Sequence, residues 1–204
     1  MNSMSRVVDS QGDVGYDAGK VGECLKRRVD PEYVSSRQGA ANQQLNYLTG
    51  EVAINIVNDI FGYDGWSDEI RSVTDVESTK GNDGKWTVSC SVVVRIHLRR
   101  ENVSREDIGH GTGINASKLL ALEKAQKEGA TDGFKRACRK FGPATGNCLY
   151  NKRYNEMVGK FRRSGGRVNE FGDEDLYRIG QGRISEYFAV SKKRKMGDGN
   201  HGKW

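Results

Sequence analysis

The sequence has no run of apolar residues long enough to cross a bilayer. Its first twenty residues contain acidic side chains and lack a hydrophobic segment, so we expect neither a secretory signal nor a typical organellar presequence there. Cysteine is scarce as well. The four cysteines (Cys24, Cys90, Cys138 and Cys148) lie far apart and form no Cys-x-x-Cys pair. This spacing argues against a zinc site and favours buried, reduced thiols in an intracellular protein.

The sequence also lacks the motifs of nucleotide-dependent enzymes. No GxxxxGK followed by Ser or Thr is present, and none of the three histidines stands at metal-ligand spacing from a cysteine or carboxylate. Gly109, Gly111 and Gly113 only superficially resemble a dinucleotide loop, because their spacing is G-x-G-x-G and the preceding strand is predicted to be antiparallel. The acids at 106–107 and 173–175 form no convincing nuclease set. We therefore predict a protein that is not an enzyme and needs no cofactor or metal.

Basic charge and enough apolar sequence for one core are present. The chain has 204 residues, of which 35% are hydrophobic, and this suffices for one ordinary domain. Its net charge of +6 favours a polyanionic partner without establishing one, since many solvated surfaces are basic. We divide the chain into a flexible arm (1–20), one domain (21–158) and a basic, partly disordered tail (159–204).

Periodicity predicts an α+β fold. Apolar residues recur at helical spacing over 49–61, and Gly62 provides a stop. An extended segment at 66–78, a turn-like KGNDGK at 80–85 and a long period-two strand at 86–98 follow. A shorter strand, SREDIGHG, precedes a long helix. The order predicts an antiparallel β-β-β-α core with additional helices. An exposed edge on the long strand would be an aggregation hazard unless neighbouring subunits cover it.

The long helix lies in LEKAQKEGATDGFKRACRKFGPATGNCL, residues 122–149, with Asn115 or Ser117 as its expected N-cap. One side is predicted to be apolar or small and comprises Leu119, Leu122, Gly129, Ala130, Gly133, Phe134, Ala137 and Phe141. The opposite side comprises Lys124, Lys127, Thr131, Lys135 and Arg139. An interior glycine costs about 1 kcal/mol relative to alanine, so we expect Gly129 and Gly133 to permit close approach to the sheet. Gly142 and Pro143 are expected to end the helix.

The KRACRK segment concentrates Lys135, Arg136, Arg139 and Lys140 in under two turns, with only Asp132 nearby. A basic helix face can simply solubilise a surface. This density, however, repels itself unless phosphates or counterions neutralise it. The cluster therefore favours a nucleic-acid backbone as ligand.

Several motifs in order resemble the N-terminal annealing domain of the Rad52 recombination proteins. They are PEYVSSR (31–37), FGYDGW (61–66), EDIGHG (106–111), LEKAQKEGATDGFKRACRKFG (122–142) and GNCLYNKRY (146–154). The resemblance implies a β-β-β-α core assembled into a ring, with single-stranded DNA in a positively charged outer groove. It also implies annealing of complementary strands in double-strand break repair and homologous recombination, without ATP. Double-stranded DNA or RNA as further ligands stays open.

The resemblance also implies site residues. Arg37, Lys135, Arg136 and Arg139 correspond to an inner DNA groove, and the neighbouring Lys124 and Lys127 are added to it from their place on the basic face. Lys85 and Lys152 correspond to a second, outer DNA surface. The segment GTGINASK is one residue shorter than the family pattern, and Glu156 stands where the family often has a basic residue. A long C-terminal region that in many members binds replication protein A and a recombinase has no counterpart, so those partners are unsupported.

Aromatic residues and the tail leave alternatives open. Tyr33 and Tyr47 could contact bases or sugars, or pack in the core, and Tyr154 could also stack. Trp66 is expected to fill the core. The tail motif Lys192, Lys193, Arg194 and Lys195 is either an import signal, an auxiliary DNA-binding patch or a solubilising tail.

We predict a nuclear protein, with an organellar, phage or bacterial origin as the alternative. The rival functions are a non-annealing accessory paralogue that binds DNA or RNA within a larger relative's ring, and a structural interaction subunit.

Overall fold

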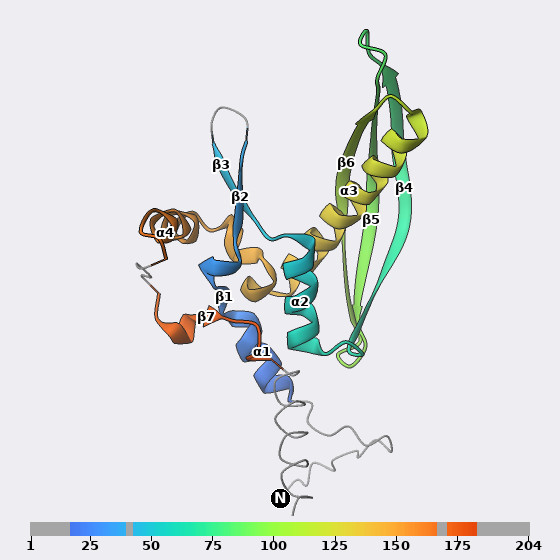
Figure 1. Ribbon diagram of the computed structural model, residues 1–204. Coiled ribbons are helices and arrows are strands. Elements are labelled where there is room, and N and C mark those ends of the chain that lie inside the picture. The colour runs from blue at the N-terminus through green and yellow to red at the C-terminus, as the bar shows by residue number, and fades with distance from the viewer. Residues whose placement is uncertain (1–16, 40–42, 167–170, 183–204) are drawn as a thin grey trace, which may run out of the picture.

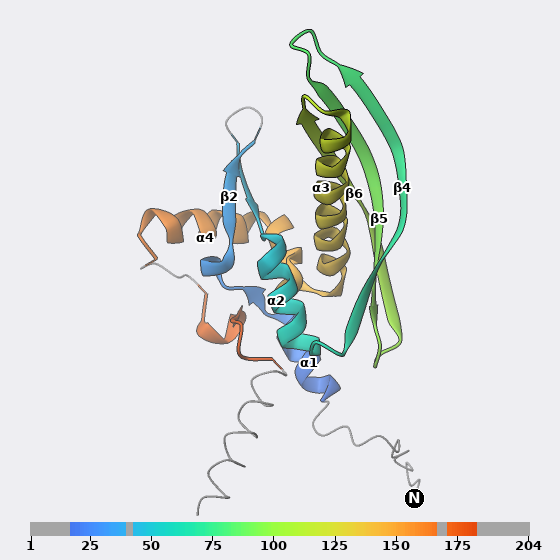
Figure 2. The same cartoon turned by 45° about the vertical axis from the view of Figure 1, so that its right-hand side comes forward.

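A computed structural model describes residues 17–39, 43–166 and 171–182. A curved three-stranded sheet with one long helix against it forms one part of the molecule (Figures 1 and 2). The shorter helices and two small sheets form the other part, and one of these small sheets is a hairpin. The predicted α+β class is confirmed, including the antiparallel strand, strand, strand, helix order. No described helix is long and apolar enough to span a membrane.

The helices and strands have the following bounds. The α-helices are α1 (Ala18–Lys26), α2 (Gly50–Phe61), α3 (Lys118–Cys138) and α4 (Lys152–Arg163). The strands are β1 (Arg28–Val29), β2 (Ser35–Gln38), β3 (Gln44–Tyr47), β4 (Trp66–Lys80), β5 (Trp86–Leu98), β6 (Val103–Asn115) and β7 (Leu176–Tyr177). Short 3-10 turns occupy Pro31–Tyr33, Arg139–Phe141, Pro143–Thr145, Asn147–Tyr150 and Asp173–Asp175.

Local sequence signals account for the ends of α2 and α3. The Thr49 hydroxyl accepts a hydrogen bond from the Val52 amide, and Gly62 ends α2 with a φ of 84°, which favours glycine. Ser117 caps α3, as one of the two predicted candidates. The α-helical part of α3 ends at Cys138, earlier than predicted, and a 3-10 turn continues to Phe141, just before Gly142. The predicted helix ends are thus correct to within one turn.

Strand β6 is as long as β5, so the prediction of a shorter strand at this position was wrong. Three alternating glycines lower the intrinsic strand propensity of β6 and obscured it. In the structure these glycines all face α3. A Cβ on Gly109, Gly111 or Gly113 would lie 2.1, 1.9 or 1.9 Å from the nearest α3 backbone atom. The glycines of β6 are therefore packing residues that bring the helix backbone against the strand backbone.

The expected close approach of Gly129 and Gly133 to the sheet is confirmed. A Cβ on these two residues would lie 2.7 and 2.8 Å from Val92 Cγ2 and Val94 Cγ2 respectively. The predicted apolar face was wrong at Leu119, whose side chain is 72% exposed. Ala121 and Ala125 are buried in the first half of α3 instead, because only small side chains fit over the β6 glycines.

The sheet has β5 at its centre, paired with β4 on one side and β6 on the other. The prediction that β5 exposes a free edge was therefore wrong, because both of its edges are covered within the chain. Two carboxylates of α3 reach the outer edge of β6: Asp132 Oδ2 accepts from the His110 amide and Glu128 Oε2 from the Thr112 amide, each at 3.2 Å. In the described part of the chain, no further strand pairs with β4.

The segment after α4 returns to the body of the protein. Strand β7 pairs in parallel with β1, and the buried Asp59 accepts hydrogen bonds from the Tyr177 hydroxyl and the Gly180 amide. Arg178 forms an ion pair with the buried Asp30 at 2.7 Å. The domain boundary predicted at residue 158 thus falls inside α4, and residues 171–182 pack on the domain. The import-signal candidate at 192–195 lies outside the described residues.

Candidate nucleic-acid interface

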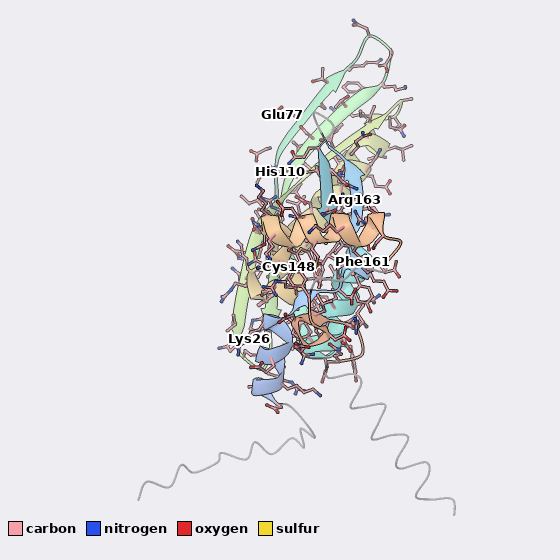
Figure 3. All side chains as sticks on the ribbon, turned by 90° about the vertical axis from the view of Figure 1, so that its left-hand side faces the viewer. Lys26, Glu77, His110, Cys148, Phe161 and Arg163 are labelled. Carbon is pink, nitrogen blue, oxygen red and sulfur yellow. The ribbon has the colours of Figure 1, made fainter. Side chains whose placement is uncertain are left out.

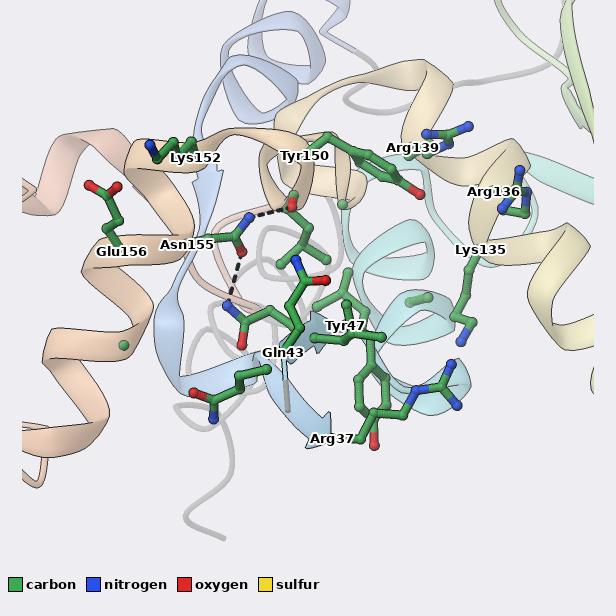
Figure 4. A pocket seen from close by; sticks show the side chains of 18 of the residues that line it. Arg37, Gln43, Tyr47, Lys135, Arg136, Arg139, Tyr150, Lys152, Asn155 and Glu156 are labelled. Carbon is green, nitrogen blue, oxygen red and sulfur yellow. Dashed lines mark hydrogen bonds between the residues drawn. The ribbon is translucent and has the colours of Figure 1, made fainter. Parts of the chain in front are cut away.

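A hollow of about 1050 Å³ opens between the second half of α3, the β2–β3 hairpin and α4 (Figure 4). Its lining is strongly basic. The cations that line it are Arg37, Lys135, Arg136, Arg139, Lys152, Lys160 and Arg163. The carboxylates that line it are Asp132 and Glu156. A concave surface with this charge focuses the positive electrostatic field of the protein and attracts a polyanion.

Six predicted site residues line this hollow, and five of them come from elements that lie about a hundred residues apart in the sequence. Arg37 is on β2, Tyr47 is on β3, and Lys135 and Arg136 are on α3, with Arg139 in the turn that follows. The Lys135 ammonium lies 5.7 Å and the Arg37 guanidinium 5.9 Å from the centre of the Tyr47 ring. These distances are typical of cation–π contacts. The half-buried Tyr47 thus holds two cations of different elements beside each other.

Asp107, on β6, contacts three cations at the end of α3 and in the turn that follows it. Its carboxylate lies 3.1 Å from Lys140 Nζ, 3.4 Å from an Arg139 guanidinium nitrogen and 3.8 Å from Arg136 Nε. Only 15% of its side chain is exposed. Burial raises the pKa of Asp107, but hydrogen bonds from the Ile108 amide, Lys140 and Arg139 outweigh burial, and the net pKa is lowered. Asp107 therefore stays ionised and offsets repulsion among the three cations.

Replacing Asp107 with asparagine should lower the free energy of unfolding by about 1 kcal/mol at neutral pH. The loss is no larger because solvent screens the partly exposed partners of Asp107. A lowered folded-state pKa contributes stability that is present above the unfolded value and lost as pH falls through the folded value. The difference in the free energy of unfolding between wild type and Asp107→Asn should therefore persist down to about pH 4 and disappear below it. Urea unfolding at several pH values measures it.

The neighbouring Glu106→Gln is a matched control, since Glu106 forms an exposed ion pair with Arg95 at 3.0 Å. Glu106→Gln should lower the free energy of unfolding by less than about 0.5 kcal/mol. An equal effect of the two substitutions would show that Asp107 has no special role in the cluster.

Tyr150 is a hollow-lining residue that the sequence analysis missed. Its ring is 64% exposed, and the Arg139 guanidinium lies 4.3 Å from the ring centre. Figure 4 shows Tyr150 beside Arg139 at the top of the hollow. An exposed aromatic beside arginine and lysine side chains is an arrangement with which proteins stack nucleic-acid bases. The only sequence signal was its place in GNCLYNKRY, eleven residues after Arg139.

Other predicted residues do not line the hollow. Lys124 and Lys127 are exposed about two to three turns before Lys135 along α3. Tyr33 packs against the core, and Tyr154 is fully buried with its hydroxyl donating to the Val29 carbonyl at 2.6 Å. The stacking role considered for Tyr154 is therefore wrong. Trp66 packs on Phe134 at 5.6 Å between ring centres, as expected of a core residue.

The two residues predicted for an outer surface lie on different parts of the molecule. Lys152 begins α4 and lines the hollow. Lys85 lies in the β4–β5 turn and pairs with Asp83 at 3.6 Å. At that end of the sheet, Lys80 and Lys118 lie over the Trp86 ring at 5.8 and 5.0 Å. The surface around Lys85 is thus built from β4, β5 and the start of α3, without Lys152.

The described residues hold no group of His, Cys, Asp and Glu side chains suited to a metal. All four cysteines are buried thiols outside any disulfide, as predicted. Burial raises the pKa of Cys148 to about 11, with smaller opposing effects from hydrogen bonds of Val29 and Tyr154. Burial also raises the pKa of Cys138. These thiols stay protonated at neutral pH and are packing residues.

The sequence matches the family described as Rad52/22 family double-strand break repair protein over residues 17–167. The chain belongs to this family. The match covers the sheet, α3 and every wall of the hollow, and the resemblance drawn from the motifs is confirmed. Residues 171–182, which return to β1 and α2, lie beyond the matched segment.

Fungal Rad52-family proteins are similar to this chain over most of its length. The DNA repair and recombination protein RAD52 of Kluyveromyces lactis is 37% identical over 175 residues, covering 85% of this chain and 38% of that protein. RAD52 of Eremothecium gossypii is 41% identical over 155 residues, covering 76% and 35%. The DNA repair and recombination protein rti1 of Schizosaccharomyces pombe is 41% identical over 162 residues, covering 78% and 41%. The chain spans less than half the length of each relative.

Proposed function

We propose that this Rad52-family protein binds single-stranded DNA and anneals complementary strands without ATP, in homologous recombination and double-strand break repair. The observation that carries the proposal is the convergence of Arg37, Lys135, Arg136 and Arg139 on one hollow beside two tyrosines. Family membership and the names of the relatives, all DNA repair and recombination proteins, support the biological setting.

Annealing requires a surface that holds the phosphate backbone and leaves base edges free for the partner strand. Arginine and lysine contacts to phosphate position a strand without specifying its sequence. The planar guanidinium of Arg37 or Arg136 can hold one phosphate through two hydrogen bonds. Base pairing then supplies the free energy, since DNA stacking is worth about 1.4 kcal/mol per step. Such a mechanism has no covalent step and needs no nucleotide hydrolysis.

We also propose that the chain assembles into a homo-oligomeric ring. The outer edge of β4 is 15 residues long, and Ile70, Val73 and Val76 on this strand are 57%, 39% and 53% exposed. Ile108 and Ile114 on β6 are 47% and 54% exposed. A long open edge with apolar side chains favours contact with another chain, and head-to-tail contacts can close into a ring. Sedimentation of the purified protein as a monomer at annealing concentrations would contradict this assembly.

The direct test is ATP-free annealing of two complementary fluorescent oligonucleotides by the purified chain, at low and moderate salt. We expect accelerated pairing, with binding that weakens steeply as salt rises because counterions are released from the strand. Binding without faster pairing would identify a non-annealing accessory protein. Absence of salt-dependent binding would identify a structural subunit. Nuclear location is part of the proposal, and the named relatives come from eukaryotes.

A further inference from the structure

Helix α4 presents one face to the hollow along its whole length. Six of its residues line the cavity: Lys152, Asn155, Glu156, Gly159, Lys160 and Arg163. Their spacing of one, three or four residues places them on a single helical face. In Figure 4 the side chains of Lys152 and Glu156 stand on the wall opposite Lys135 and Arg136. The hollow is therefore bounded by two helices and not by α3 alone.

The two walls have the same charge composition. The α3 wall contributes Lys135, Arg136 and Arg139 with one carboxylate, Asp132. The α4 wall contributes three cations, Lys152, Lys160 and Arg163, with one carboxylate, Glu156. Lys152 and Arg163 stand about 16 Å apart along the helix axis. That length corresponds to about five phosphates of a stacked strand, which carries one charge per ~3.4 Å.

Buried and hydrogen-bonded residues hold α4 in place. Tyr154 is fully buried. Asn155 accepts from Asn46 at 2.9 Å and donates to the Leu149 carbonyl at 2.7 Å. Arg162 donates to Asn46 Oδ1 at 3.0 Å and to the Val34 carbonyl. These bonds tie α4 to β3 and to the chain before β2, so its hollow-facing cations keep their position relative to the hairpin.

Arg162 and Arg163 are adjacent in sequence but differ in their surroundings. Arg162 is engaged by the backbone and Asn46, whereas Arg163 is exposed and has no hydrogen bond or ion pair within residues 17–39, 43–166 and 171–182. The Arg163 guanidinium lies over Gly159, where a Cβ would be 3.4 Å from it. Figure 3 shows Arg163 and Phe161 on opposite sides of α4. Arg163 is thus available to an anionic ligand in the hollow.

We propose that Lys160 and Arg163 form a second phosphate-binding wall, which holds the same single strand from the side opposite Lys135 and Arg136. This inference rests on the proposed function. It explains how the chain accommodates Glu156 in a DNA groove: the two cations that follow within two turns offset its charge. Glu156 also stands four residues before Lys160, the orientation in which a Glu–Lys pair stabilises a helix.

The test is the salt dependence of oligo-dT binding by the full chain, measured by fluorescence anisotropy. For single strands the slope of log affinity against log salt changes by about 0.7 for each phosphate contact. Lys160→Gln/Arg163→Gln should therefore reduce the slope by about 1.4 and weaken binding about tenfold or more at low salt. Glu156→Gln should strengthen binding, an effect that a purely structural role of α4 would not produce.

The charge-matched control is Lys26→Gln/Arg153→Gln. Arg153 is exposed on α4 outside the hollow, and Lys26 is exposed on α1. The control should retain nearly the wild-type slope. If the Lys160/Arg163 variant behaves like the control while wild type binds and anneals, the second wall is disproved and the annealing proposal stands. If wild type binds no oligo-dT, the proposed function fails and the second wall fails with it.

Discussion

Replacing Lys135 and Arg136 with alanine should slow strand annealing at least tenfold and leave the fold intact. Both side chains are partly exposed on the α3 wall of the hollow, and neither belongs to the buried core. Removing two phosphate contacts should reduce the salt slope of single-strand binding by about 1.4. The same fluorescent annealing assay measures the rate, and circular dichroism confirms that the variant is folded.

The matched control for this variant is Lys124→Ala/Lys127→Ala. It removes the same charge from the same helix, at two exposed positions outside the hollow. We expect it to retain most of the wild-type rate. Equal losses in the two variants would mean that net charge, and not the geometry of the hollow, governs activity. Loss only in the Lys124/Lys127 variant would place the groove nearer the start of α3.

Replacing Gly111 with alanine should destabilise the protein by about 3 kcal/mol or more, or prevent folding. The new Cβ would lie 1.9 Å from the Ala125 carbonyl oxygen and 2.5 Å from the Gly129 amide nitrogen. Both neighbours are backbone atoms, so no side-chain rotation can relieve the clash and α3 would have to move away from β6. Urea unfolding measures the loss.

Gly22→Ala in α1 is the control for this substitution. A Cβ at Gly22 meets no atom within 4 Å, and alanine is favoured over glycine in a helix by about 1 kcal/mol. The control should therefore be neutral or slightly more stable than wild type. A Gly111→Ala variant within about 1 kcal/mol of wild type would contradict the close helix–strand packing.

Sequence periodicity predicted the elements that depend on local pattern. Residues 86–98 alternate with period two and form β5 over the same range, and the Thr49 and Gly62 signals bound α2. The pattern failed where tertiary contact outweighs local preference. Gly109, Gly111 and Gly113 disfavour a strand in isolation, yet they form one because α3 fits only against a strand without side chains. Leu119 matched the helical apolar period, but it lies outside the contact between α3 and β6 and is exposed.

The motifs likewise predicted one part of the candidate site and missed another. The motifs marked Arg37, Lys135, Arg136 and Arg139 as one DNA groove, and the structure brings them to one hollow. The motifs also grouped Lys85 with Lys152, which lie on separate surfaces, and they did not mark Tyr150, Lys160 or Arg163. Whether two residues face each other depends on how distant elements pack, and spacing along the chain does not encode it.

By itself, the sequence determined the family, the α+β class, the order of strands and helix, and the basic character of the surface, because these follow from motifs, local periodicity and composition. Only the tertiary structure decided which cations share a cavity. Lys135 meets Tyr47 and faces α4 because the β6 glycines seat α3 on the sheet, and because Asn46, Asn155 and Arg162 tie α4 to the hairpin. The contacts of Tyr47 and Asn46 join residues about a hundred positions apart, so the groove is a property of the packed fold.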